Sequence, residues 1–118
     1  MTISECYKTF NGDFEGVCTR LLSVERVTKF AIRFLDNDDY EKLKNAMEQK
    51  NWDQAFLSAH TLKGIALSLG FTRFAEVTSK LTEELRGGLK SEKMANEYFV
   101  LVTEEYNKIR EGLSQYSQ

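Results

Sequence analysis

The sequence has no proline, seven glycines and two cysteines in 118 residues. Turn-rich β architectures need proline and glycine, so their scarcity favours long helices, as does the wealth of Leu, Glu, Lys and Ala. Cys6 and Cys18 show neither metal-ligand spacing nor a CxxC redox motif, and a single histidine does not complete a zinc site. We therefore expect an all-α protein with two reduced thiols, no metal and no other cofactor.

The sequence also lacks a large charge excess and a long apolar run. Sixteen basic and 18 acidic residues give a formal net charge of −2, so no global field attracts nucleic acid or an anionic membrane. No window approaches the roughly 20 apolar residues of a membrane-spanning helix, and the first residues do not resemble a cationic leader. We expect a cytoplasmic protein whose partners are other proteins.

Apolar residues recur at steps of three and four along most of the chain, which is the periodicity of amphipathic helices. Helices are predicted within 1–10, at about 14–35, 38–49 and 52–70, between Thr72 and Gly87, and after Ser91. Ser23 is a possible internal N-cap of the second of these, Asn51 is well suited to cap the fourth, and Thr72 can cap the fifth. Residues 1–118 have room for one domain, for which we expect an antiparallel four-helix bundle with one or two short accessory N-terminal helices.

The segment 52–70 is unusual because apolar residues surround it instead of forming one stripe. On a wheel of roughly 100° per residue, the arc expected to face the core contains Ala55, Ser58, Ala59, Leu62, Ile65, Ala66 and Leu69. The opposite side contains His60 together with Phe56, Leu57, Lys63, Gly64, Leu67 and Phe71. Such a face is either a second buried contact or a docking surface.

His60, Lys63 and Gly64 lie on adjacent turns of one side of this helix. A neutral imidazole nitrogen is a good nucleophile near neutral pH. An ammonium group one turn away offers positive charge to phosphoryl oxygens. A glycine one turn beyond the nucleophile removes a side chain that would crowd a phosphohistidine or an incoming partner. The three residues together suit the acceptance of a phosphoryl group.

The run Ala59-His60-Thr61-Leu62-Lys63-Gly64, followed by Leu69-Gly70-Phe71, resembles the A-H-x-L-K-G…L-G signature of histidine-containing phosphotransfer (HPt) domains. The upstream run 51–56, Asn-Trp-Asp-Gln-Ala-Phe, is similar to the entry into that helix, and Gly12-Asp13 and Arg20-Leu21-Leu22 fit more loosely. The resemblance is strong over about 51–88 and weaker over 11–50.

The resemblance implies that His60 is phosphorylated, that Lys63 assists with the phosphoryl group and that Gly64 leaves space for it. Such domains have no ATP-dependent kinase activity. They exchange the phosphoryl group with an aspartate of a response-regulator receiver domain or of a hybrid histidine kinase, and Mg²⁺ belongs to the receiver. Family members often orient the imidazole with a polar side chain of the facing helix, for which Thr82 and Arg86 are the nearest candidates here.

Other interpretations of these residues stay open. Phe56, Leu57, Leu67 and Phe71 are either core residues or the rim on which a receiver packs. The alternative function is a phosphorylation-inactive adaptor or scaffold of the same fold that binds a signalling protein. The dimerisation domain of a histidine kinase is disfavoured, because Thr61 follows the histidine where those domains usually have an acidic residue, and the chain has no proline. The pairs Glu83-Glu84 and Glu104-Glu105 are typical of solvated helix faces. A complete bundle in one chain favours a monomer.

Overall fold

A computed structural model describes residues 1–117 of the chain. The elements are α1 (Ile3–Thr9), α2 (Phe14–Leu21), α3 (Val24–Arg33), a 3₁₀ turn η1 (Phe34–Asp36), α4 (Asp39–Glu48), α5 (Trp52–Leu69), α6 (Thr72–Leu85) and α7 (Glu92–Ser114). No strand occurs within these 117 residues. The all-α class predicted from the sequence is confirmed.

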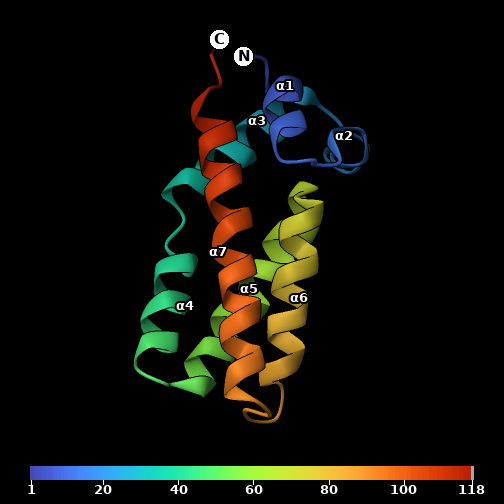
Figure 1. Cartoon of the computed structure of the whole chain (residues 1–118). Coiled ribbons are helices and arrows are strands. Elements are labelled where there is room, and N and C mark those ends of the chain that lie inside the picture. Colours follow the sequence, from blue (N-terminus) through green and yellow to red (C-terminus); the bar gives the residue numbers. More distant parts are fainter. Residues whose placement is uncertain (118) are drawn as a thin grey trace.

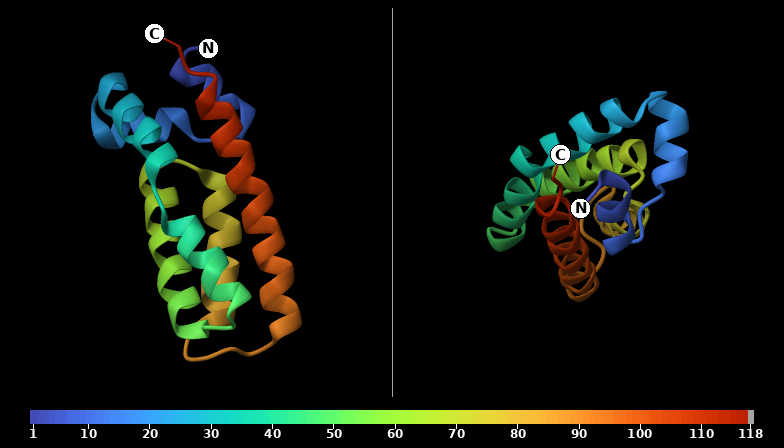
Figure 2. Two further views of the ribbon diagram at one scale, coloured as in Figure 1. Left: turned by 90° about the vertical axis from the view of Figure 1, so that its left-hand side faces the viewer. Right: turned by 90° about the horizontal axis from the view of Figure 1, so that it is seen from above.

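Helices α4, α5, α6 and α7 lie along the long axis of a molecule that measures 43 × 23 × 19 Å (Figure 1). Helix α5 packs against α4 and α6, and α6 packs in turn against α7. The shorter helices α1, α2 and α3 gather at one end, where α1 contacts α7 and α3 contacts α5 (Figure 2). The result is a helical bundle with an accessory cluster at the end that also holds the N-terminus.

Side-chain caps explain where most helices begin. The five capping residues each accept a hydrogen bond from the backbone N–H three positions later, and they are Thr2, Asp13, Ser23, Asn51 and Ser91. Ser23 divides the stretch predicted as 14–35 into α2 and α3, so there are three accessory helices instead of one or two. Thr72 is the first residue of α6 and not its cap, because Phe71 occupies the N-cap position without a side-chain bond.

The turn after α5 sends one residue to an unexpected place. Gly70 ends α5 in the left-handed conformation, with φ of 71°. Phe71 therefore does not continue the helical rotation of α5, and it is only 1% exposed. The centroid of its ring lies 5.4 Å from that of Phe10 and 5.2 Å from that of Phe34. The prediction that Phe71 shares the side of His60 is wrong, because the helix ends before it.

The inner arc of α5 is buried as the wheel predicts. The buried members are Ala55, Ser58, Ala59, Leu62, Ala66 and Leu69, and Ile65 is partly buried. The N-terminal segment holds the end of this helix, because the Tyr7 hydroxyl donates to the Leu69 carbonyl at 2.7 Å and the Asp13 N–H donates to the Gly70 carbonyl at 2.8 Å. Burial raises the pKa of the Tyr7 phenol well above its ordinary value.

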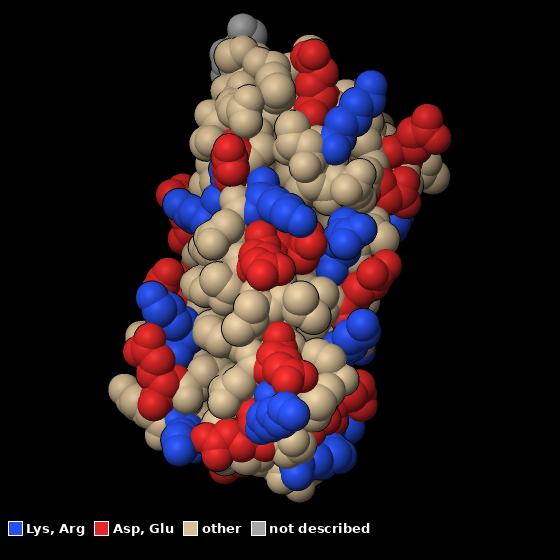
Figure 3. All heavy atoms as spheres, in the orientation of Figure 1, with Lys and Arg blue, Asp and Glu red and all other residues tan. Residues whose placement is uncertain are grey.

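The surface carries both signs of charge in alternation, without a large patch of one sign on the face shown in Figure 3. Glu105 departs from the solvated face predicted for it, because it is 7% exposed and accepts from Arg73 at 3.4 Å and Lys108 at 3.3 Å. Glu105 thereby ties α6 to α7. Of the helices formed by residues 1–117, none has the length and apolar character needed to cross a membrane.

Candidate functional site

His60 lies midway along α5 with its side chain exposed to solvent. Its neighbours Ala59 and Leu62 are fully buried, and the helical rotation from them carries His60 to the outer side. Among the described residues, no hydrogen bond or ion pair reaches the imidazole, and the nearby Thr61 hydroxyl donates to the Leu57 carbonyl. Within residues 1–117 neither ring nitrogen is therefore engaged by a protein partner.

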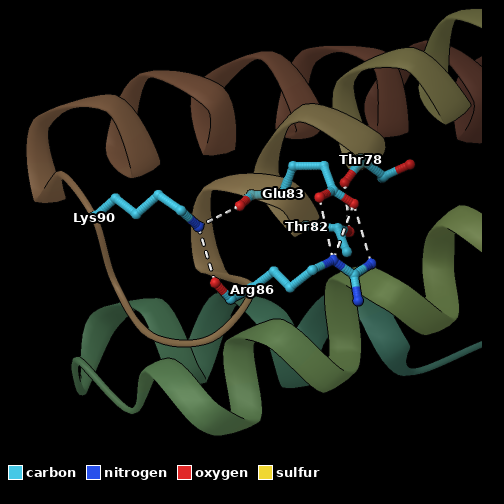
Figure 4. A network of polar contacts seen from close by, with 5 residues as sticks. All are labelled: Thr78, Thr82, Glu83, Arg86 and Lys90. Atoms are coloured by element: carbon cyan, nitrogen blue, oxygen red, sulfur yellow. Dashed lines mark hydrogen bonds and ion pairs between the residues drawn. The ribbon is translucent and has the colours of Figure 1, made fainter.

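The imidazole does have an aromatic neighbour. The ring of Phe56, one turn earlier, lies nearly parallel to it at 14°, with 5.9 Å between centroids. The guanidinium carbon of Arg86 lies 5.2 Å from the Phe56 centroid. Arg86 is held in turn by Glu83, to which Nε and Nη2 donate at 3.0–3.2 Å (Figure 4). A chain of contacts therefore runs from α6 through Phe56 to His60.

Lys63 lies one turn after His60 and is partly buried. It lines a hollow of about 380 Å³ together with Arg20 of α2 and Glu76 of α6. The pKa of the Glu83 carboxyl lies below its usual value, first because Arg86 hydrogen-bonds to it and to a smaller extent because Lys63 is near. Within residues 1–117 Lys63 forms no ion pair, so its charge is available to a group bound beside His60.

Gly64 opens onto a different hollow. A Cβ at Gly64 would meet nothing within 4 Å. The glycine lines a groove of about 660 Å³ between α3 and α5, whose other residues are Leu21, Phe30, Arg33, Phe34, Asn37, Thr61, Ile65, Ser68 and Leu69. Phe30 is 40% exposed, and the guanidinium carbon of Arg33 lies 5.8 Å from its ring. Lys63 and Gly64 thus border hollows on two sides of the same helix.

The remaining residues singled out from the sequence divide into two groups. Leu57 and Leu67 are each 57% exposed on α5. Thr82 is fully buried, and its hydroxyl donates to the Thr78 carbonyl at 2.7 Å, so within residues 1–117 no hydrogen bond to the imidazole supports the orienting role predicted for Thr82. A threonine hydroxyl inside a helix readily bonds the carbonyl one turn earlier, and here that bond uses the only O–H donor of Thr82.

The groove beside Gly64 was not predicted from the sequence. Phe30 occupies an apolar position of the periodic stretch 14–35 and therefore looks like a core residue. Its exposure depends on the break at Ser23, which gives α3 a direction of its own. One feature of the sequence could have indicated a surface on α3. This helix also contains Arg26, Lys29 and Arg33, which are all exposed, although acidic residues outnumber basic ones in the chain.

No group of three or more His, Cys, Asp or Glu side chains within residues 1–117 is arranged to hold a metal ion.

Comparison with known proteins gives one match. The family model described as Hpt domain matches residues 37–115. These residues include α4 to α7, and with them His60, Lys63 and Gly64, whereas α1 to α3 precede them. No curated protein and no solved structure matches the chain significantly.

Proposed function

Since this chain belongs to the Hpt domain family, we propose that it is a phosphoryl carrier of a phosphorelay and that His60 is the acceptor. The observation that carries the proposal is an exposed imidazole on α5 with an uncommitted ammonium group, that of Lys63, one turn away. Such domains pass phosphoryl groups to the receiver domains of response regulators, so the partner is a receiver, free or within a hybrid histidine kinase.

In the proposed reaction, the lone pair of a neutral imidazole nitrogen attacks the phosphorus of an aspartyl phosphate on the receiver. The bond between phosphorus and the aspartyl oxygen breaks, and the carboxylate leaves with the bonding electrons, while the ring keeps the N–H on its other nitrogen. Lys63 offsets the charge on the phosphoryl oxygens, and Gly64 leaves room for the group. Transfer to a second receiver is the same step in reverse.

The surface around His60 supports a docking role. Leu57 and Leu67 are exposed on α5, and Gly64 of the same helix lines the groove that also contains Phe30. Exposed apolar side chains ringed by polar residues are typical of protein interfaces. We propose that the receiver packs over this face, so that a charge introduced by Phe30→Asp would weaken receiver binding while leaving His60 chemically intact.

We further propose that residues 1–118 form one domain, although the family match starts at 37. Its support is that α2 reaches the end of α5, where Arg20 donates to the Leu67 carbonyl at 3.0 Å, and that Val17 and Val27 are fully buried. In this proposal α4 to α7 are the antiparallel four-helix bundle of a monomer. The unpaired thiols of Cys6 and Cys18 fit a cytoplasmic location.

The test is transfer of labelled phosphate. Wild-type protein and the variant His60→Gln are incubated with receivers of the source cell that carry a labelled aspartyl phosphate. We expect label on the wild-type protein and none on His60→Gln, in an acid-labile form typical of phosphohistidine. The control is Lys93→Ala, which removes an exposed lysine of α7 that forms no ion pair within residues 1–117 and should take label as wild type does. Wild-type protein that binds a receiver but takes no label would contradict the proposal and favour the phosphorylation-inactive adaptor.

A further inference from the structure

Within residues 1–117 no hydrogen bond or ion pair holds the His60 ring in one orientation. The O–H groups of Thr61 and Thr82 are engaged elsewhere, since Thr61 donates to the Leu57 carbonyl and Thr82 donates to the Thr78 carbonyl. An exposed imidazole without a partner samples several staggered rotamers. Only some of these rotamers present a nitrogen to a group that arrives from solvent, so a restraint on the ring would raise its reactivity.

Phe56 is placed to give that restraint. The two rings are near-parallel, at 14° and 5.9 Å, within the roughly 4.5–7 Å range of aromatic pairs. Residues four apart on a helix lie on the same side, so the contact does not depend on the rest of the bundle. The inner part of Phe56 packs against the core, and this leaves its ring with little freedom of its own.

Arg86 fixes Phe56 from a second element. Its guanidinium makes three hydrogen bonds to Glu83 and stands over the Phe56 ring. The backbone at Arg86 is also held, because the Lys90 ammonium donates to its carbonyl at 2.9 Å and to that of Glu83 at 2.8 Å (Figure 4). The support therefore comes from the end of α6, and it stays in place whichever way the imidazole turns.

We propose that Phe56 is a positioning residue, whose ring, supported by Arg86, sets the plane of the His60 imidazole for attack on phosphorus. This inference rests on the proposed function of His60 as the phosphoryl acceptor. Phe56 takes no part in bond making. It increases the fraction of molecules whose attacking nitrogen faces outward, and an aromatic pair of ordinary strength changes that fraction roughly two- to tenfold.

A small phosphoryl donor separates this role from a docking role. With phosphoramidate, the imidazole nitrogen attacks phosphorus, the P–N bond of the donor breaks, and the protonated nitrogen leaves as ammonia with the bonding electrons. No protein surface is needed for this reaction. If Phe56 only formed part of the receiver interface, its removal would change the KM for the receiver and leave the rate with phosphoramidate unchanged.

The structure offers a matched control for the loss of an aromatic pair. Phe99 of α7 stacks on Tyr40 of α4 at 6.0 Å and 15°, nearly the geometry of the pair at His60, and it is also partly buried. The variants Phe56→Leu and Phe99→Leu therefore remove equivalent contacts at two places in the bundle. Any general loss of stability should be similar in the two, and thermal unfolding of each measures it.

We expect Phe56→Leu to react with phosphoramidate roughly two- to tenfold more slowly than wild type, and Phe56→Tyr to recover the rate, because its ring stacks equally well. Arg86→Gln, which retains Phe56, should slow the reaction less, by at most about threefold. Phe99→Leu should react as wild type does. Arg86→Gln also keeps the inference testable if Phe56→Leu folds poorly.

The ring itself can be observed by NMR, because the chain has a single histidine. In wild type the ring protons of His60 should show the ring-current shift of Phe56 and side-chain couplings of one dominant rotamer. Phe56→Leu should give averaged couplings, whereas Phe99→Leu should not. If Phe56→Leu reacts with phosphoramidate at the wild-type rate, or if Phe99→Leu is slowed equally, the positioning role of Phe56 is overturned and the proposed function of His60 stands. Wild-type protein that takes no phosphoryl group from phosphoramidate or from any receiver overturns the proposed function, and the inference with it.

Discussion

Gly64 allows a substitution that should strengthen the fold and weaken the transfer. The residue lies inside α5, and a Cβ built on it meets nothing within 4 Å. Glycine in a helix interior is about 0.8–1.0 kcal/mol less favourable than alanine. Because no contact opposes the added methyl group, Gly64→Ala should raise the free energy of unfolding by about 1 kcal/mol. For a domain of this size, that corresponds to a rise of roughly 3–6 °C in Tm.

The same methyl group would occupy space that the proposed transfer needs. If a receiver approaches closely enough to bring its aspartyl phosphate to His60, the surface over Gly64 is part of the contact. Inserting atoms into a close-packed contact costs typically 1–3 kcal/mol, and about 1.4 kcal/mol is a factor of ten in affinity. Receiver-dependent phosphorylation of Gly64→Ala should therefore be about tenfold slower, and that of Gly64→Gln slower still. Phosphoramidate should be affected less.

Gly112 of α7 supplies the contrast. A Cβ there would collide with the Thr9 hydroxyl and lie 2.9 Å from the Phe10 ring, so Gly112→Ala should lower Tm. Urea or thermal unfolding followed by circular dichroism measures stability, and labelled receiver phosphate measures transfer. A lower Tm for Gly64→Ala would refute the claim that the added methyl group stabilises α5. A higher Tm together with a wild-type transfer rate would refute the claim that the transfer needs the space over Gly64.

Three further predictions concern docking, charge and pH. Leu57→Asp should raise the KM for a receiver without changing the phosphoramidate rate, whereas Val100→Asp, equally exposed on α7, should change neither. Lys63→Ala should slow phosphorylation by both donors by roughly tenfold, with partial recovery in Lys63→Arg, as expected when a positive charge offsets the phosphoryl oxygens. Tyr7→Phe loses the bond to the Leu69 carbonyl and should cost about 1 kcal/mol of stability. Burial raises the Tyr7 pKa, so the contribution of Tyr7 to the free energy of unfolding is fully present below pH of about 10, where the phenol of the unfolded chain is neutral. That contribution declines as the pH rises further. Unfolding measured as a function of pH should show this loss of stability in wild type and less of it in Tyr7→Phe.

Local signals in the sequence predicted the helix starts well. Asn51 was identified as the cap of α5 and Ser23 as a break, and both accept the backbone hydrogen bond that defines a cap. These predictions succeed because a cap depends on a few consecutive residues. The outward position of His60 followed from helical rotation, which needs only the period and the identity of the core arc.

The predictions that the structure does not support have both local and long-range causes. Phe71 was placed by extending a wheel one residue past Gly70, where the left-handed turn redirects the chain. Thr82 sits at a plausible spacing from His60, yet spacing does not reveal that its hydroxyl is already bonded to the Thr78 carbonyl. The groove under Phe30 depends on how α3 lies against α5, which no pattern within α3 encodes.

A phosphoryl group on His60 would be exposed to solvent. No segment of residues 1–117 closes over the exposed ring, so water reaches the nitrogen–phosphorus bond as readily as a receiver does. The lifetime of the phosphorylated protein would then depend on the intrinsic lability of the nitrogen–phosphorus bond and on how soon a receiver binds. No segment of residues 1–117 would control when the phosphoryl group is released. In such a molecule the abundance of the receiver, more than any motion of the carrier, decides whether a signal is delivered or decays.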